Sequence, residues 1–278
     1  MRFYICILLF PVFVLCGARS EASDGRNYYA VIIGVDRYQH LQSGLSPLKF
    51  VKNDVEAITG MLLSLGWERE NIEIIAGERA TKRNLISVFD GWLRRLGPRD
   101  ILFVYWAGHG YPDLADQRRV YFACYDTDLK KPWTGYRMDK VVRSIKGHGI
   151  VNVVFVADTC HAGKIATRSG GSKGLSIQPY LEDIPSNKNI PEGWIFMAAT
   201  EAGHQAVENR KFENGIFTYC FVQAVKNHKT LKGVRRELVK RVPIEAEKVT
   251  DAEVKPVVVT TSADEKIWDM TLDLRGNR

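Results

Sequence analysis

The sequence is poor in cysteine, and its apolar runs are short. Five cysteines occur in 278 residues, and two of them fall in the first 16 residues. The three that follow, Cys124, Cys160 and Cys220, are an odd number, so they imply no disulfide framework and favour a free thiol. The apolar run over residues 3–15 is shorter than the ~20 residues of a comfortable membrane span. No internal repeat is visible, so nothing indicates a repeat architecture.

The N-terminal residues predict export. A basic residue precedes the apolar run, and the small residues of Cys16 to Ser20 (C-G-A-R-S) follow it, as in a secretory signal peptide cleaved after Ser20. A lipoprotein signal at Cys16 is the alternative, although Leu15 stands where a small residue is usual. We therefore exclude residues 1–22 from the fold. The expected product is periplasmic or secreted and has no stable membrane span once the signal is removed.

The remaining composition is that of an ordinary globular protein. Hydrophobic residues make up 45% and charged residues 26% of the chain, and the length suits one large domain or two small ones. The net charge of +7 is concentrated in residues 226–241, which carry +6. We interpret this segment as the solvated face of a late helix; contact with an anionic envelope or nucleic acid is the alternative. No aromatic residue is interleaved, so no nucleic-acid partner is expected.

One buried strand ends in a thiol. Residues 151–157 are an almost continuous run of apolar, mostly β-branched residues, which is typical of a strand buried on both faces. Asp158 follows at once, and Cys160 comes two residues later. In open α/β sheets, ligands bind at the carboxyl ends of the strands, so Cys160 is a candidate nucleophile. A buried structural cysteine is the alternative, and it is the role expected of Cys124 and Cys220.

A second buried strand ends in a histidine. Residues 100–107 contain another apolar run, and His109 follows between two glycines. If the two strands are parallel neighbours, His109 and Cys160 emerge at the same edge of the sheet. A nearby imidazole promotes conversion of a thiol to the nucleophilic thiolate. His161 competes for this role, but adjacent residues of an extended chain point to opposite sides, which favours His109.

Strands and helices alternate along the chain. Apolar periodicity and stop residues predict strands over 28–35, 71–75, 100–109, 151–157, 194–199 and 256–261, and helices over 48–65, 81–96, 138–145 and 215–225. Thr81 is the expected N-cap of the second helix. Such alternation gives a parallel sheet with helices on both faces. Residues 120–124 fit a small hairpin arm, and residues 164–191 break the pattern as a polar linker.

Six motifs in a fixed order resemble one family. They are Y-A-V-I-I-G-V-D-R-Y at Tyr29–Tyr38, N-D at Asn53–Asp54, A-G-H-G at Ala107–Gly110, D-T-C-H-A-G at Asp158–Gly163, A-A-T-E-A-G-H-Q-A-V-E at Ala198–Glu208 and G-I-F-T-Y at Gly215–Tyr219. With them the chain resembles, over residues 28–261, the caspase-like cysteine peptidases of family C14 in clan CD, in particular their metacaspase and bacterial orthocaspase branch. His109 lies 51 positions before Cys160, and roughly 50 is the separation known for caspases.

The resemblance implies a fold and a division of the chain. The expected fold class is α/β, a caspase-like three-layer sandwich whose mostly parallel central sheet of about six strands carries helices on both faces. The peptidase domain would cover residues 27–278. It would consist of a large-subunit-like part over 27–163, a linker over 164–191 and a small-subunit-like part over 192–278. The linker contains four basic residues, so we expect a peptidase specific for basic residues to cut it.

The resemblance also implies an activity, the hydrolysis of internal peptide bonds by a cysteine-type endopeptidase. Cys160 would attack the peptide carbonyl, and His109 would give a proton to the leaving amine. No third residue is obvious, so the sequence predicts a catalytic dyad. As the resemblance implies, the backbone N–H groups of Gly110 and Cys160 are the expected donors of an oxyanion hole.

The expected specificity rests on two carboxylates. In metacaspases, the residues that match Asp158 and Asp54 bind a basic side chain, so the resemblance predicts peptide or protein substrates cleaved after Arg or Lys. For Asp158, capping of the turn that follows is the alternative. Metacaspases often carry Ser where this chain has Ala107, so the pocket is expected to have one hydrogen bond fewer. Gln205 and Glu208 are further candidates for lining the substrate cleft.

No metal or cofactor is expected. Many metacaspases need calcium, and Asp126 and Asp128 form a D-x-D pair. Such a pair usually belongs to a turn, and calcium requires more oxygen ligands than are gathered here.

Two alternatives to a peptidase of this specificity stay open. One is a caspase-fold pseudo-enzyme or binding module without proteolysis, against which the intact Cys160 and His109 argue. The other is a clan CD hydrolase with another specificity.

Overall fold

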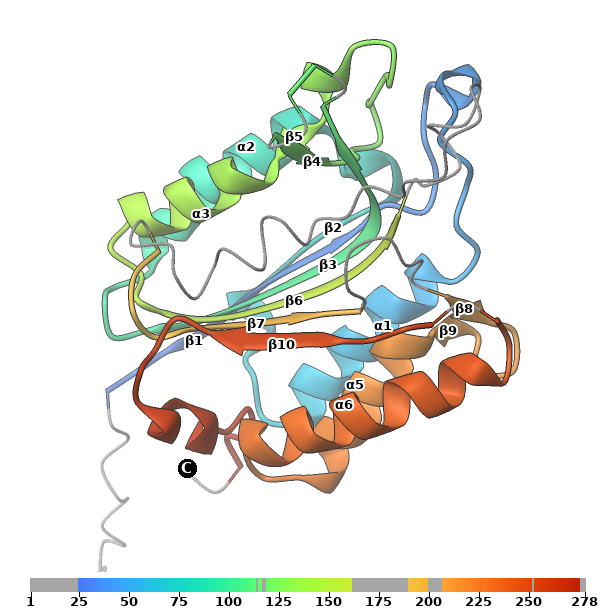
Figure 1. Cartoon of the computed structure of the whole chain (residues 1–278). Helices are drawn as coiled ribbons and strands as arrows, with labels where there is room; N and C mark the ends of the chain where they lie inside the picture. The colour runs from blue at the N-terminus through green and yellow to red at the C-terminus, as the bar shows by residue number, and fades with distance from the viewer. Residues whose placement is uncertain are drawn as a thin grey trace, which may run out of the picture.

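The computed structural model describes residues 25–113, 115–116, 119–161, 190–199, 207–251 and 253–275, with the backbone alone for Cys160 and His161. The predicted signal segment and residues 164–189 of the predicted linker lie outside the described residues. Figure 1 shows one central sheet between two layers of helices. No helix in the described part of the chain is long and apolar enough to cross a membrane.

Five parallel strands and one antiparallel strand form the main part of the sheet. The parallel strands are β1 (Tyr28–Gly34), β2 (Ile72–Ala76), β3 (Ile101–Pro112), β6 (Asn152–His161) and β7 (Trp194–Ala198). The last strand, β10 (Val257–Thr260), pairs antiparallel with β7. The order across the sheet is β10-β7-β6-β3-β1-β2. The predicted, mostly parallel sheet of about six strands is confirmed.

Helices cover both faces of this sheet, as the sequence predicts. One face carries α2 (Lys82–Asp90) and α3 (Met138–Gly147), and the other carries α1 (Val51–Ser64), α5 (Ile216–Asn227) and α6 (Leu231–Glu247) (Figure 1). Two short strands, β4 (Val120–Phe122) and β5 (Tyr136–Arg137), extend the sheet beside the last residues of β3. The chain therefore forms the expected three-layer sandwich.

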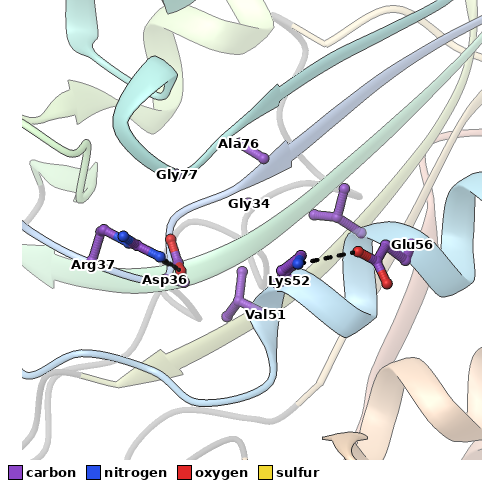
Figure 2. Close-up of a pocket in the computed structure, with 9 residues that line it drawn as sticks. Gly34, Asp36, Arg37, Val51, Lys52, Glu56, Ala76 and Gly77 are labelled. Carbon is purple, nitrogen blue, oxygen red and sulfur yellow. Dashed lines mark hydrogen bonds and ion pairs between the residues drawn. The ribbon is translucent and has the colours of Figure 1, made fainter.

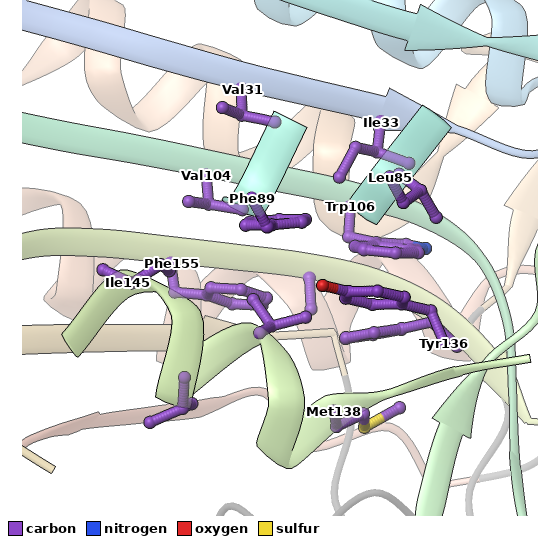
Figure 3. Close-up of a cluster of buried hydrophobic side chains, with 14 of the residues drawn as sticks. Val31, Ile33, Leu85, Phe89, Val104, Trp106, Tyr136, Met138, Ile145 and Phe155 are labelled. Carbon is purple, nitrogen blue, oxygen red and sulfur yellow. The ribbon is translucent and has the colours of Figure 1, made fainter. Parts of the chain in front are cut away.

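The strands are buried on both faces because their apolar residues alternate between two cores. In β1, Val31 and Ile33 pack in the core under α2 and α3, whereas Ala30 and Ile32 pack in the core under α1 and α5. Figure 3 shows the first core, with Val31, Ile33 and Trp106 facing the side chains of α2 and α3. A one-residue slip would exchange the two faces of a strand, so this burial determines the register of the sheet.

One helix is shorter than predicted. The helix expected over residues 81–96 ends at Asp90, and Trp92–Arg95 form a 3₁₀ turn instead. Gly91 lies between the two, and glycine is unfavourable inside a helix. The predicted cap is confirmed, because Thr81 Oγ1 accepts a hydrogen bond from a backbone N–H of the first turn at 3.3 Å.

The strand that carries His109 is longer than predicted. β3 continues to Pro112 because Gly110, Tyr111 and Pro112 pair with β4, the hairpin arm expected over residues 120–124. Immediately after His109, the backbone of β3 is therefore held by β4 as well as by β6.

The sequence does not predict a small hairpin that lies at the start of α1. Its strands, β8 (Glu208–Asn209) and β9 (Asn214–Gly215), pair antiparallel with each other. A strand of two residues has no alternation that could be recognised in a sequence.

The basic segment, residues 226–241, has the solvated face predicted for it, since Lys232, Arg236 and Lys240 are exposed on α6.

Candidate active site

The two strands that end in a histidine and a cysteine are parallel neighbours. β3 and β6 pair from Ile101 opposite Asn152 to Gly110 opposite His161, and in this register the Cα atom of His109 lies opposite that of Cys160. Both residues therefore lie at the carboxyl ends of adjacent central strands. The side chain of Cys160 is outside the described part of the structure, so the catalytic role of the pair stays a prediction.

The imidazole of His109 is held by two groups from the loop after β1. Its Nε2 lies 2.9 Å from the backbone oxygen of Ser46. A carbonyl oxygen can only accept, so Nε2 carries the hydrogen and the lone pair of the neutral ring is on Nδ1. The ring also stacks on Tyr38, with ring centroids 5.4 Å apart, and the backbone N–H of His109 donates to the Tyr38 hydroxyl at 3.1 Å.

The sequence indicates no third residue beside His109 and Cys160, and in the structure the backbone oxygen of Ser46 lies against the imidazole. Ser46 orients the histidine through a backbone carbonyl, which any residue type offers, so no sequence pattern could have indicated it. Tyr38 belongs to the first of the six motifs, but its contact with His109 spans 71 positions and depends on the pairing of β1 with β3. Both contacts follow from the way the loop after β1 folds back over the end of β3.

A glycine is required directly before the histidine. Gly108 has a φ of +154°, and a Cβ atom at this position would lie 3.3 Å from the Cβ atom of Val35. That contact is closer than packed carbon atoms prefer.

Gly110, the expected oxyanion donor, pairs with Phe122 on one side and His161 on the other. Its role in catalysis stays a prediction.

The two carboxylates of the predicted specificity pocket converge on one glycine. Asp54 Oδ1 accepts hydrogen bonds from the backbone N–H of Gly215 and from Asn214 Nδ2, both at 2.9 Å. Asp158 Oδ2 accepts from the backbone N–H of Thr218 at 3.1 Å and from its Oγ1 at 2.5 Å. A Cβ atom at Gly215 would collide with Asp158 and come within 3.3 Å of Asp54 Oδ2.

Both carboxylates therefore cap the N-terminus of α5. Gly215 is the N-cap of this helix and Thr218 lies in its first turn, where negative charge is stabilised by the helix dipole. The alternative predicted for Asp158, a cap of the turn that follows it, stays a prediction, because most of that turn lies outside the described residues. The cap that Asp158 forms on α5 joins residues 60 positions apart. Sequence spacing cannot reveal a cap formed across the tertiary structure.

Burial raises the pKa of both carboxyl groups. Asp54 and Asp158 are 2% and 5% exposed. For Asp54, burial is the main cause and the neighbouring Asp158 is the second, and together they outweigh the hydrogen bonds from Asn214 and Gly215. For Asp158, burial outweighs the two bonds from Thr218. The pair therefore tends to retain a proton in the free protein, and a cation placed beside it would favour the ionised form.

A hydroxyl relay supports Asp158. Thr218 Oγ1, which donates to Asp158, lies 2.6 Å from the hydroxyl of Tyr105, so Tyr105 donates to Thr218. Ala107 is fully buried and lies opposite Asp158 in the register of β3 and β6. Asp158 thus has a hydroxyl partner in Thr218, although position 107 carries none. Thr218 lies in the motif G-I-F-T-Y, but nothing in that motif indicates its bond to Asp158, which joins residues 60 positions apart.

Glu208 and Gln205 are the two other residues predicted to line the substrate cleft. Glu208 points to the start of α1, where its two carboxylate oxygens accept the backbone N–H groups of Lys49 at 3.1 Å and Phe50 at 2.8 Å. Both oxygens are thus engaged within the protein, which does not favour the expected contact with substrate. Gln205 lies outside the described residues.

A cavity of about 300 Å³ opens beside the carboxyl ends of β1 and β2 (Figure 2). Two ion pairs flank it, Asp36 with Arg37 at 3.2 Å and Lys52 with Glu56 at 3.8 Å. The other residues that line it are small or aliphatic: Gly34, Val51, Val55, Ala76 and Gly77. Its charges are paired and neither buried carboxylate of the site lines it. This cavity is therefore not the expected pocket for a basic side chain.

The acidic pair considered for calcium has a structural role. Asp128 Oδ1 accepts the backbone N–H of Lys130 at 3.0 Å, as the turn interpretation predicts. Asp126 Oδ1 instead accepts the backbone N–H of Lys82 at 2.9 Å, at the start of α2 and 44 positions earlier. Within the described ranges, no group of three or more His, Cys, Asp or Glu side chains could hold a metal ion. That activity requires no metal stays a prediction.

The fold and the matched motifs define a caspase-type protein. The family model of the peptidase C14 caspase domain matches residues 27–266, and the chain therefore belongs to this family of cysteine peptidases. A comparison with curated protein sequences finds no match.

Solved structures share the fold at low sequence identity. A protein of Geobacter sulfurreducens is 14% identical, with 88% of this chain and 97% of that chain covered and a TM-score of 0.62. Caspase-1 of Spodoptera frugiperda is 12% identical, with 86% and 88% covered and a TM-score of 0.59. The pro form of that caspase is 12% identical, with 86% and 93% covered and a TM-score of 0.56. At such identities these likenesses establish the fold alone.

Replacement of Asp54 by Asn should stabilise the protein at alkaline pH. Its raised pKa, about 8, means that the folded protein holds a proton that the unfolded chain releases above about pH 4. The free energy of unfolding therefore falls as the pH rises from about 4 to about 8. A neutral amide removes this fall, so Asp54→Asn should raise Tm at pH 8 and change it little at pH 4. Thermal unfolding in a Cys160→Ala background measures both.

The matched control is Asp100→Asn. Asp100 is also buried, at 6% exposure, and accepts the backbone N–H groups of Asn27 and Gly97, but it lies at the opposite end of β3. Loss of charge-assisted hydrogen bonds should lower the Tm of this variant. A Tm that falls equally in Asp54→Asn at pH 8 would show that Asp54 is ionised there and that the pKa assignment is wrong.

Proposed function

We propose that this protein is an exported cysteine endopeptidase that cleaves after Arg or Lys through a dyad of Cys160 and His109. One observation carries the proposal: the register of β3 and β6 sets His109 opposite Cys160 at the carboxyl ends of two central strands. The hydrogen bond from His109 Nε2 to the Ser46 carbonyl adds to it, because it leaves Nδ1 as the basic nitrogen of the neutral ring.

The reaction follows from these groups. His109 Nδ1 takes the thiol proton of Cys160, and the thiolate sulfur attacks the peptide carbonyl carbon. The C–N bond then breaks, and His109 returns the proton to the departing amine. Water, deprotonated by His109, attacks the thioester, and cleavage of the C–S bond releases the carboxylic acid and restores the thiol. The backbone N–H groups of Gly110 and Cys160 are the proposed donors to the oxyanion.

The preference for a basic side chain is proposed from the pair of buried carboxylates. Asp54 and Asp158 both adjoin Gly215, so a cation reaching this point would be paired twice. Burial and repulsion from Asp158 raise the pKa of Asp54, because both disfavour its ionised form in the free protein. A bound cation would stabilise that ionised form. A basic side chain should therefore bind with release of a proton. Arg is favoured over Lys, because its planar donors can meet two carboxylates at once.

Two alternatives predict different behaviour. A pseudo-enzyme would retain the fold without turnover, and the paired placement of His109 and Cys160 does not favour it. A clan CD hydrolase of another specificity would use the same dyad, with the two carboxylates serving only to cap α5. The specificity experiment below separates this second case from the proposal.

Substitution of either member of the dyad should abolish turnover. Cys160→Ala and His109→Ala are each expected to lower kcat by several orders of magnitude, since the two residues act as a unit. His148→Ala is the matched control, because His148 Nε2 also bonds a backbone carbonyl, that of Phe89 at 2.9 Å, away from the site. Hydrolysis of a fluorogenic peptide library measures all three. Near-normal turnover by Cys160→Ala would end the peptidase proposal.

Cleavage after Arg should exceed cleavage after Asp by about a thousandfold. A third carboxylate about 4 Å from the pair would be repelled by about 4 kcal/mol at a surface-type effective dielectric, and each 1.4 kcal/mol is tenfold in rate. Asp158→Ala should lose most of the cleavage after Arg. The kcat/KM values for matched Arg and Asp substrates test this, and efficient cleavage after Asp by the unmodified enzyme would refute the pocket while leaving the dyad intact.

Export is proposed from the N-terminal sequence. A basic residue, the apolar run over residues 3–15 and the small residues up to Ser20 have the order of a signal peptide. The mature protein is expected in the periplasm or medium of a secreting host and should begin at Glu21. Intact-mass measurement of the exported chain checks this, and a full-length protein retained in the cytoplasm would contradict it.

A further inference from the structure

The β8–β9 hairpin holds the start of α1. Besides the two bonds of Glu208 to Lys49 and Phe50, the side chain of Asn53 donates to the Glu213 carbonyl at 2.8 Å. Asp54 accepts from the far end of the same hairpin, at Asn214 and Gly215. The hairpin follows the predicted linker in sequence, and its partners are about 160 residues earlier. These bonds therefore join the small-subunit-like part to the large-subunit-like part.

Glu208 provides the capping hydrogen bonds that the N-cap residue of α1 does not make with its own side chain. The N-cap residue of α1 is Phe50, whose side chain cannot cap the helix. Glu208 Oε1 accepts the N–H of Phe50, and Oε2 accepts the N–H of the residue before it. A carboxylate here gains from charge-assisted hydrogen bonds and from the positive end of the helix dipole. Two successive backbone N–H groups are thus bound by one side chain.

The chain held by Glu208 is the same chain that orients His109. Ser46, whose carbonyl oxygen accepts from His109 Nε2, lies only three residues before Lys49. Between them, the N–H of Leu48 donates to the Asp36 carbonyl at 2.8 Å. Segment 46–50 is therefore held at its middle by Asp36, two residues after β1, and at its far end by Glu208. Loss of the Glu208 bonds would loosen the segment around the bond of Leu48, and a looser segment would let the Ser46 carbonyl shift relative to the imidazole.

We infer that Glu208 is a positioning residue, which holds segment 46–50 so that the Ser46 carbonyl keeps the imidazole of His109 in one orientation and one tautomer. The effect of Glu208 on catalysis rests on the proposed function, whereas its effect on the orientation of His109 does not. This positioning role replaces the expected contact of Glu208 with substrate, because both carboxylate oxygens are already bound to backbone N–H groups. By this route the C-terminal part of the chain influences the histidine on β3.

The kinetic test compares three variants. Glu208→Ala removes both acceptors, and Glu208→Gln keeps one. Asp264→Asn is the control, since Asp264 also accepts a backbone N–H, that of Lys266 at 2.9 Å, but caps a 3₁₀ turn near the C-terminus. Glu208→Ala should lower kcat about tenfold to a hundredfold, the range expected of a misplaced catalytic group, with KM changed less than threefold. The kcat of Glu208→Gln should lie between those of Glu208→Ala and the unmodified enzyme. The kcat of Asp264→Asn should stay within twofold of that of the unmodified enzyme.

A second readout is independent of turnover. In the Cys160→Ala background, Glu208→Ala should speed hydrogen exchange at the amides of Lys49 and Phe50. The ¹⁵N spectrum of the His109 ring should change from one tautomer, protonated at Nε2, to a mixture of two. Neither change should occur in Asp264→Asn. If Glu208→Ala fails to fold, Glu208→Gln, which retains one hydrogen bond, carries the same measurements.

The outcomes separate the two ideas. Faster amide exchange with an unchanged His109 tautomer and unchanged kcat would overturn the inference, because Glu208 would then only stabilise α1. A rise in KM at constant kcat would also overturn it and restore the substrate-contact role. If the unmodified protein hydrolyses no peptide, the proposed function fails, and the tautomer measurement still decides whether Glu208 positions His109.

Discussion

The parallel pairing of β3 with β6 is the interaction on which the site depends. These strands are buried on both faces, and their apolar residues alternate between two separate cores. A register shift by one residue would place every side chain in the opposite core, so hydrophobic burial holds His109 opposite Cys160. The position of the proposed dyad is thus a consequence of packing along the whole length of both strands, and no local interaction between the two residues is needed to create it.

The two buried carboxylates connect stability with the proposed specificity. Asp54 and Asp158 cap α5, yet their burial raises the pKa of both groups, so the free protein holds them in an unfavourable environment. Binding sites often retain such destabilising groups because the ligand compensates for them. The same arrangement links α5 to α1 and β6, so substitutions at these two carboxylates are expected to affect folding and the proposed recognition together.

Much of the fold could be predicted because it follows from local patterns. Continuous apolar runs marked the central strands, and Thr81 marked a helix start that the structure confirms. Errors arose where a local pattern was weak or misleading. The helix expected to reach residue 96 ends at Asp90, and the two-residue strands of the β8–β9 hairpin have no detectable period. The bonds of Glu208 to the backbone N–H groups of Lys49 and Phe50 join residues about 160 positions apart, so no local pattern could indicate them.

The sequence by itself determined the order of strands and helices along the chain and placed one histidine and one cysteine at the ends of two buried strands, since apolar periodicity and motif order are properties of the linear chain. The tertiary structure made these two strands parallel neighbours. Only the tertiary structure decided what surrounds them: the Ser46 carbonyl on His109, the Thr218 hydroxyl on Asp158 and the Glu208 carboxylate on α1. The physical reason is that each of these contacts joins residues at least 60 positions apart. Two of them also use backbone groups, which every residue type presents alike.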